Sequence, residues 1–323
     1  MAKDIPGNCP QSYIWEVFVL ISVIICTYRR PDRIELALKS LERQTYNSSD
    51  WEVLVVENDF ASALAMNAII DQYKESLPLR HVLEPNVGLS NARNTGARLA
   101  NGEYLAYLDD DAEAVDYWLS SLIEVCRSKK PHFCGGPSLP LYLSAKPAWF
   151  LDAYATSYMY GNQARFLKTG EWLGGMNFIV SKKIYGELGG FRTDLGMNGN
   201  NIGYGEETDL MIRAWKNNPQ LKVLYIPNIV VRHEVRPEKM ILRWNLIAAW
   251  ALGRSASTVF PINRKKALIG FMRVFKNIAF KVLMIVPWLF RRKKNKYYLQ
   301  QWLYEEFRAL FHGFAYNLYS LFR

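Results

Sequence analysis

Residues 19–26 read VLISVIIC, a short and nearly continuous apolar run that is rich in β-branched side chains. Such a run is typical of a strand that is covered on both faces in a parallel sheet, and it is too short to span a bilayer. A polar turn over 27–32 follows it, and the next residues place Ile34, Leu38 and Leu41 on one face of a helix. The sequence therefore opens with a strand–turn–helix unit.

This alternation repeats through the first third of the chain. We expect strands over 53–56, 80–83 and 104–108, and helices over 61–73 and 90–99. Alternating elements of these lengths predict an α/β fold with a doubly wound, mainly parallel sheet, in which ligands bind beyond the carboxyl ends of the strands.

The regular pattern is interrupted over 137–163, an aromatic and Pro-rich stretch that we interpret as an excursion from the sheet. Its Trp and Tyr side chains offer flat ring faces on which a ligand could stack, so we expect this stretch and the loop over 189–205 to contribute to ligand selection. Further along we predict a strand over 177–180, a helix over 182–188, the Gly/Asn-rich loop over 189–205, a helix from Glu206 to about Lys216 and a pair of strands near 223–231.

The net charge of +10 belongs to one end of the chain. Residues 241–323 contain 15 Lys/Arg and only two acidic residues, whereas residues 1–240 carry a small negative balance. We therefore divide the chain into an N-terminal segment (1–18), a catalytic domain (19–236) and a basic, aromatic-rich helical extension (237–323). Four cysteines without regular spacing, and a start without a signal-peptide pattern, favour a reducing, cytosolic setting.

Three successive carboxylates, Asp109, Asp110 and Asp111, follow the strand predicted over 104–108. Adjacent carboxylates at one strand end repel one another, so we expect a cation to offset the repulsion. A divalent ion held by one or two carboxylates, with further oxygens from a diphosphate, is the usual arrangement in magnesium and manganese sites. The alternative is a solvated acidic turn that caps the next helix.

A second acidic group, Glu206, Glu207 and Asp209, follows the Gly/Asn-rich loop and opens a helix. Acidic residues in a first turn complement the helix dipole, which explains part of this pattern. Neighbouring carboxylates also raise one another's proton affinity, as a general base requires. We therefore predict that this group removes the proton from a sugar hydroxyl.

Two weaker signals complete the set. His233 follows the β-branched residues 229–231, so we expect it at the carboxyl end of a strand, as a structural imidazole or as a metal ligand. The segment from Asn86 to Asn94 opens a helix with a glycine turn and places Arg93 one turn inside. Such helix starts bind anions, and they also occur as plain caps.

Taken together, these features resemble the family-2 glycosyltransferases, which have the GT-A fold, over about residues 19–236. The motifs are specific as an ordered set. They are Thr27-Tyr28-Arg29-Arg30-Pro31, Val55-Val56-Glu57-Asn58-Asp59, Asn86-Val87-Gly88, Ala92-Arg93-Asn94-Thr95-Gly96, Asp109 to Asp111, Gly174-Gly175, Gly189-Gly190-Phe191, Glu206 to Leu210 with Arg213, and His233.

The resemblance implies a nucleotide-sugar half over about 19–111 and an acceptor half over about 112–236. It also implies that Asp111 and His233, with Asp109, hold Mn²⁺ or Mg²⁺. The donor-binding residues that it implies are Thr27, Tyr28, Arg30, Glu57, Asp59, Asn86, Arg93, Asp109, Asp110 and Gly175.

The reaction that the resemblance implies is a direct displacement that inverts the anomeric carbon. It would be a hexosyl transfer from a nucleotide sugar, a UDP-sugar foremost, to a hydroxyl of a lipid-linked or polysaccharide acceptor. Glu207 aligns with the family's usual catalytic aspartate and is expected to be the base, with Glu206 as acceptor ligand or alternative base. The family usually has Asp where this chain has Glu57 and Glu207, so both carboxylates are longer by one methylene.

The extension suggests a membrane partner. Its apolar run over 278–290 is interrupted by Lys281 and Pro287, which suits a helix lying in the membrane interface better than a spanning one. We expect the Lys/Arg of 265–296 to bind anionic lipids on the cytoplasmic face of the membrane. The alternative is a helical cap on the catalytic domain or a contact with a second copy of the chain. No nucleic-acid module is recognisable, so we expect no nucleic-acid partner.

Two other classes of protein stay open at this stage. A membrane-bound subunit that binds nucleotide sugars or glycans would keep the pocket and lack a working base. A nucleotidyltransferase would need a pyrophosphate-binding basic loop after the first strand, and Arg29 and Arg30 supply only part of one.

Overall fold

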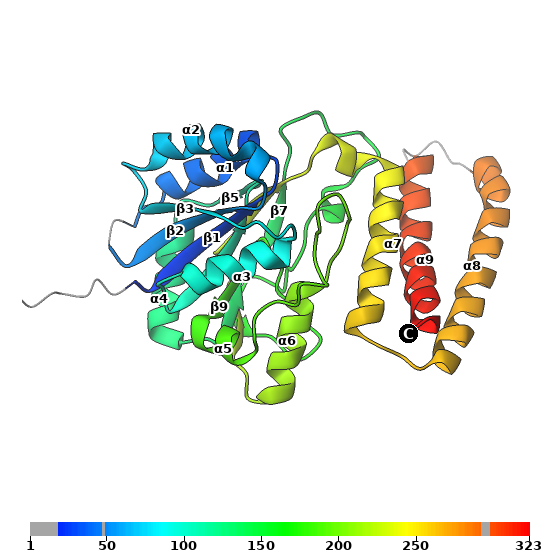
Figure 1. Ribbon diagram of the computed structural model, residues 1–323. Helices are drawn as coiled ribbons and strands as arrows, with labels where there is room; N and C mark the ends of the chain where they lie inside the picture. Colours follow the sequence, from blue (N-terminus) through cyan, green and yellow to red (C-terminus); the bar gives the residue numbers. More distant parts are fainter. Residues whose placement is uncertain (1–18, 47–48, 292–297) are drawn as a thin grey trace, which may run out of the picture.

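The computed structural model describes residues 19–46, 49–291 and 298–323. The predicted N-terminal segment, 1–18, lies outside the described residues, and so do the cations within 292–297. Figure 1 shows an α/β part followed by three long helices that stand side by side at the C-terminal end.

The α/β part is built on an eight-stranded sheet with the order β3-β2-β1-β4-β9-β6-β10-β8. Its first four strands are parallel neighbours, and β9 runs antiparallel between β4 and β6. The predicted doubly wound, mainly parallel sheet is therefore confirmed. The strands are β1 (Ile21–Thr27), β2 (Trp51–Glu57), β3 (Leu79–Leu83), β4 (Tyr104–Asp109), β6 (Phe133–Gly135), β8 (Arg165–Phe166), β9 (Asn177–Ser181) and β10 (Val223–Tyr225).

Helices cover both faces of this sheet, because alternate residues of each strand point to opposite sides. Ile21, Val23 and Ile25 of β1 face one apolar cluster, whereas Ile24 faces the other. The first face is covered by α1 (Pro31–Glu42), α2 (Ala63–Tyr73, preceded by the 3₁₀ turn Phe60–Ser62) and α4 (Trp118–Lys129). The second face is covered by α3 (Leu89–Leu99), α5 (Lys182–Glu187) and α6 (Glu206–Asn217).

A second, three-stranded sheet lies beyond the end of β4. It has the order β5-β11-β7, with β5 (Ala112–Ala114), β7 (Ser138–Leu141) and β11 (Val231–Glu234). His233 lies inside β11, so its predicted place after a strand ending at 231 was wrong. The polar residues 232–234 continue the strand because they pair with both neighbours, and His233 is opposite Ala112, the residue after Asp111.

Three helices form the C-terminal part: α7 (Leu242–Val259), α8 (Arg264–Arg291) and α9 (Leu299–Leu321). Helix α9 packs against both α7 and α8. A side chain at Gly253 of α7 would overlap the backbone of α9 at His312, which explains the glycine there. Within the described part of the chain, we find no helix with an apolar stretch long enough for a membrane span.

The aromatic stretch connects the two parts. Trp149 and Phe150 are buried with Tyr304 of α9, and Val235 and Met240 join the same cluster. Met240 belongs to a short 3₁₀ helix, η3 (Pro237–Met240), that leads into α7. Trp149 is only 8% exposed, so it packs the extension against the α/β part and does not offer a free ring face to a sugar.

Candidate active site

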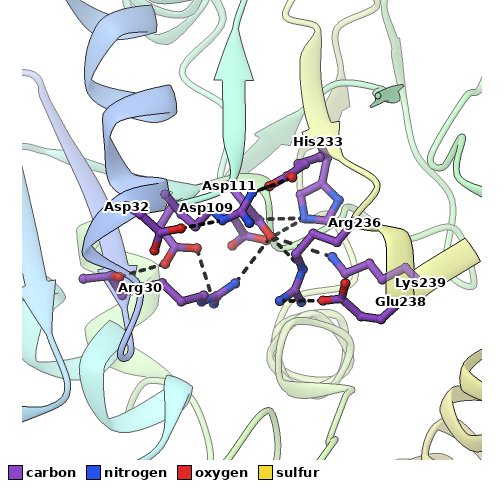
Figure 2. A network of polar contacts seen from close by, with 12 residues as sticks. Arg30, Asp32, Asp109, Asp111, His233, Arg236, Glu238 and Lys239 are labelled. Carbon is purple, nitrogen blue, oxygen red and sulfur yellow. Dashed lines mark hydrogen bonds and ion pairs between the residues drawn. The ribbon is translucent and has the colours of Figure 1, made fainter. Parts of the chain in front are cut away.

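The predicted metal ligands meet where β4 ends. His233 Nε2 lies 2.9 Å from Asp111 Oδ1 and 3.9 Å from Asp109 Oδ2, and the candidate ligand atoms of the three residues all lie within 4.8 Å of one another (Figure 2). The pairing of β11 with β5 sets this geometry. Glu234, the next residue, anchors the strand because its carboxylate accepts hydrogen bonds from Arg33 of α1 at 2.6 and 2.7 Å.

This donor set fits a divalent cation. Two carboxylates and one imidazole offer the oxygen and nitrogen ligands that Mn²⁺ accepts, and an ion would also offset the repulsion between the two aspartates. Asp109 remains 30% exposed at its side chain, so a ligand can approach the cluster from solvent. Three ligands from the chain leave room for oxygens from a bound diphosphate.

Basic side chains surround Asp111. Its Oδ2 lies 3.4 Å from Arg30 Nη1, 3.7 Å from Lys239 Nζ and 3.9 Å from Arg236 Nε (Figure 2). Burial alone would raise the pKa of Asp111, but His233, Lys239 and Arg30 outweigh burial and hold that pKa well below its usual range. Asp111 is therefore ionised at neutral pH.

Arg236 and Lys239 were missed in the sequence. Arg236 directly precedes η3 and Lys239 lies within it, both beyond the last predicted strand, and nothing in their local pattern marks them as part of a site. The one available signal is that they follow His233 by three and six residues. Arg236 Nε is buried and has no hydrogen-bond partner among the described residues, so an anionic ligand could pair with it.

Asp110 is more deeply buried than Asp109. Thr27 Oγ1 donates a hydrogen bond to its Oδ2 at 2.7 Å, and Arg30 Nη2 lies 3.3 Å from its Oδ1. Burial raises the pKa of Asp110 to about 7, although Arg30 acts in the opposite direction. Thr27 and Asp110 are almost fully buried, so they hold the end of β1 against the end of β4.

The second acidic group is tied to the first by Arg93. This guanidinium is 3% exposed at its side chain, and its Nη1 lies 2.7 Å from Glu207 Oε1 and 3.0 Å from Glu206 Oε1. Its Nη2 lies 3.5 Å from Asp109 Oδ1. Asp109 therefore contacts both His233 and Arg93, and the carboxylates of β4 and α6 share one rim.

The two glutamates differ in their surroundings. Glu206 is buried, its Oε2 has no hydrogen-bond partner among the described residues, and burial together with Glu207 raises its pKa to about 8. Glu207 is more open, with 14% of its side chain exposed. Its Oε1 lies against Gly175, where any side chain would overlap that oxygen. Glycine is therefore required at 175 for Glu207 to keep this position.

Only some of the predicted nucleoside-binding residues are accessible to a ligand. Tyr28 is half-buried, Asn86 is exposed, and Asp59 pairs with Arg29 at 3.2 Å, so a ligand can reach all three. Glu57 is fully buried and is occupied within the protein. It accepts a hydrogen bond from Ser62 Oγ at 2.6 Å and lies 3.0 Å from His81 Nε2.

Arg93 also departs from its predicted surroundings. The resemblance implied a place beside the first strand ends, whereas the guanidinium points to Glu206, Glu207 and Asp109. The reason is its buried place in α3, over the rings of Tyr107 and Phe191 at 5.7 and 5.5 Å from their centroids. Arg93 thus positions carboxylates and is not exposed to a ligand.

A mainly parallel sheet with an aspartate-rich strand end, a nearby histidine and an acidic helix start is the arrangement expected of a GT-A-type glycosyltransferase. The family model "Glycosyl transferase family 2" matches residues 22–169. The chain is therefore similar to this family over a little under half of its length.

Individual relatives agree with this family. The chain is 24% identical to a glucosyl-dolichyl phosphate glucuronosyltransferase of Haloferax volcanii over 245 residues, which are 73% of this chain and 75% of the relative. The matches to three further relatives span 23%, 25% and 42% of their lengths.

Solved structures share the fold. The mannosyltransferase PcManGT from Pyrobaculum calidifontis, in complex with GDP-Man and Mn²⁺, gives a TM-score of 0.55 at 18% identity and covers 94% of this chain and 72% of its own. Residues 1–349 of S. aureus TarS, in complex with UDP-GlcNAc, give a TM-score of 0.53 at 17% identity over 72% of this chain and 66% of TarS.

Proposed function

We propose that this glycosyltransferase is metal-dependent and inverting, and that it moves a hexosyl group from a nucleotide sugar, a UDP-sugar foremost, to a hydroxyl of a lipid-linked or polysaccharide acceptor. The observation that carries the proposal is the position of Asp109. It contacts His233 on one side and Arg93 on the other, so a cation-binding group and a pair of glutamates face one reaction centre.

The donor binds at the basic end of this rim. Asp109, Asp111 and His233 would hold Mn²⁺ or Mg²⁺, which would supply positive charge to the leaving diphosphate. Arg30, Arg236 and Lys239 add fixed positive charge at the same place, since all three lie within 4 Å of Asp111. Tyr28, Asp59 and Asn86 are the reachable candidates for nucleoside contacts.

The base acts at the other end. Glu207 is the more exposed glutamate, Arg93 fixes its position by a hydrogen bond, and we assign it to accept the proton of the acceptor hydroxyl. The acceptor oxygen then forms a bond to the anomeric carbon while the bond from that carbon to the phosphate oxygen breaks, with inversion. Burial and Glu207 raise the pKa of Glu206 to about 8, so Glu206 favours its neutral form at pH 7, and we assign it as the alternative base beside Glu207.

Relatives support the substrate classes. TarS was solved with UDP-GlcNAc and PcManGT with GDP-Man and Mn²⁺, so nucleoside diphosphate sugars and Mn²⁺ are bound by proteins of this fold. The name of the Haloferax volcanii relative specifies a glucosyl-dolichyl phosphate, which is a lipid-linked acceptor. The three described cysteines are free, as suits the cytoplasmic side of a membrane.

The outer face of α8 supports the proposed membrane contact. This face consists of exposed apolar side chains interspersed with Lys and Arg, as in interfacial helices. Its apolar members are Leu268, Ile269, Met272, Phe275, Phe280, Val282 and Leu283. We propose that this face rests on anionic lipids, with Lys265, Lys266, Arg273 and Lys276 near the headgroups.

One assay tests the function. The purified full chain is incubated with sugar nucleotides, an acceptor panel that includes lipid-linked glycans, and Mn²⁺ or Mg²⁺, and the phosphorus products are separated. We expect nucleoside diphosphate, no release after EDTA, and a product of opposite anomeric configuration. Donor binding without release would mark a non-catalytic subunit. Release of pyrophosphate in a parallel reaction, in which a nucleoside triphosphate and a sugar 1-phosphate replace the sugar nucleotide, would mark a nucleotidyltransferase. Either result overturns the proposal.

A further inference from the structure

An apolar groove of about 570 Å³ runs along the first half of α7. Five of the six residues that line it are apolar, and the sixth is positively charged. The lining residues are Leu242, Arg243, Leu246, Ile247 and Trp250 of α7 and Phe311 of α9. Ile247 is 46% exposed, so an apolar side chain that usually packs inside a protein faces water here.

The walls of the groove are rigidly built. The Trp250 ring lies 5.8 Å from Phe314 and 6.3 Å from Tyr319 of α9, measured between centroids. Phe314 in turn packs on Phe271 of α8 at 4.7 Å. These aromatic contacts fix the side chain that forms the far end of the groove, so the cavity exists without a ligand.

Helix α7 is connected to both ends of the reaction centre, through η3 on one side and through the loop before Glu206 on the other. Leu242, at the mouth of the groove, follows Lys239 by three residues, and Lys239 Nζ lies 3.7 Å from Asp111. Further along, Arg254 donates a hydrogen bond to the carbonyl of Ile202 at 2.6 Å, and Ser255 Oγ accepts one from the amide of Tyr204 at 3.1 Å. The loop held in this way leads directly to Glu206. The first residue that lines the groove is therefore three residues along the chain from a cation of the donor-binding end.

We propose that this groove holds the hydrocarbon chain of the acceptor lipid and that Arg243 binds its phosphate. The inference rests on the proposed function and adds to it the place where the lipid is recognised. Apolar walls suit an isoprenoid or alkyl chain, and a single cation at the mouth suits one phosphate group. Residues 241–323 contain only two acidic residues, Glu305 and Glu306, so the phosphate meets little repulsion there.

The experiment is photoaffinity labelling of the full chain. The probe is geranylgeranyl phosphate with a diazirine at the end of its chain, and the same alcohol without phosphate is the second arm. Trypsin cuts after Arg243, Arg254, Arg308 and Arg323, so adducts in the groove appear in peptides 244–254 and 309–323. Labelling of these two peptides is the expected result, and excess inorganic phosphate should not displace the probe.

Two matched variants on one helix sharpen the test. Ile247→Asp places a charge in the groove, whereas Leu252→Asp places one on an exposed surface of α7 that does not line it; the two side chains are 46% and 38% exposed. We expect Ile247→Asp to weaken probe binding at least about tenfold and Leu252→Asp to change it less than about twofold. Arg243→Gln should weaken binding of the phosphate probe and leave binding of the alcohol probe unchanged. If Ile247→Asp does not fold, Ile247→Ala replaces it, with a smaller loss expected.

Other outcomes overturn the inference. Adducts spread over α8, or equal losses in both aspartate variants, would show adsorption to a general apolar surface. Cross-links between two copies through peptide 244–254 would show a dimer contact. Donor turnover with a chain-free acceptor is measured in parallel. If turnover is present and the groove is not labelled, only this inference fails. If the groove is labelled and no turnover is found, the groove binds lipid, but the lipid is not shown to be an acceptor, and the proposed function is overturned.

Discussion

The two acidic groups at the rim consist of the same kind of side chain, yet their surroundings give them opposite character. Asp109 and Asp111 lie beside His233, and the fixed cations Arg30, Arg236 and Lys239 gather around Asp111, although Asp110 and Glu238 pair with two of them. Glu206 and Glu207 share one guanidinium, that of Arg93, with Asp109, so fewer cations surround each carboxyl group at their end.

This difference suits the two halves of the proposed reaction. A leaving diphosphate gains negative charge and is stabilised at the basic end, whereas the anomeric carbon gains positive charge and faces the acidic end. Burial favours the protonated form of each of these carboxyl groups, and the cations around Asp111 outweigh burial there, whereas Arg93 does not outweigh it for Glu206. Asp111 stays ionised, and Glu206 becomes neutral near pH 7.

The largest expected effect comes from removing a charge at the basic end. Asp111→Asn keeps the shape of the side chain and removes a metal ligand, so we expect turnover to fall about 10⁴-fold, or roughly 5 kcal/mol. Mn²⁺ binding, followed by electron paramagnetic resonance, should fall in parallel. The control is Asp116→Asn, because Asp116 is an exposed residue that pairs only loosely with Arg43 at 3.4 Å. Unchanged Mn²⁺ binding in Asp111→Asn would remove this residue from the metal site.

The next effect separates the two glutamates. Glu207→Gln removes the proposed base, and we expect kcat to fall about 10³-fold while donor binding, measured by calorimetry, stays the same. Glu206→Gln should cost less than about tenfold, because the amide can still donate a hydrogen bond as the protonated acid does. If Glu206→Gln is the more damaging change, the roles of the two residues are reversed.

A smaller effect comes from the residue that shapes the acidic end. In Gly175→Ala the added methyl group overlaps Glu207 Oε1, so the base must move, and displacement by about 1 Å costs roughly 10²-fold in kcat. Gly186→Ala is the matched control, since a methyl group there meets no atom within 4 Å. Donor affinity should be unchanged in both variants. Equal kcat in Gly175→Ala and Gly186→Ala would show that Glu207 does not need this position.

The sheet and the two acidic groups could be predicted because their signals are local. β1, β2 and β4 are apolar runs bounded by polar turns, and parallel strands bring their carboxyl ends to one edge whatever the details of packing. The carboxylates of Asp109 and Glu207 follow directly from this rule, since each lies where a strand ends or a helix begins.

The finer geometry depends on contacts between distant segments and could not be predicted. β5 has three residues, too few to show a periodic pattern, yet its pairing with β11 places His233 beside Asp111. Arg93 carries a helix-start signal that indicates an anion, but only the tertiary packing shows that the anions are Glu206 and Glu207. The sequence likewise suggests that Trp149 could stack on a sugar ring, whereas in the structure it is buried because α9 covers it.

The smallest effect concerns stability and tests the acidic end without catalysis. In the folded protein the pKa of Glu206 is about 8, above its ordinary value of 4.5, so between these pH values the folded state keeps a proton that the unfolded state has released. Stability therefore falls as pH rises through that window. Glu206→Gln stays neutral and removes the fall, with a gain on the order of 2 kcal/mol at pH 9 and little at pH 5. Thermal unfolding at pH 5, 7 and 9, with EDTA present, measures the difference. A gain that does not grow with pH would show that Glu206 is ionised throughout and that Arg93 neutralises both glutamates.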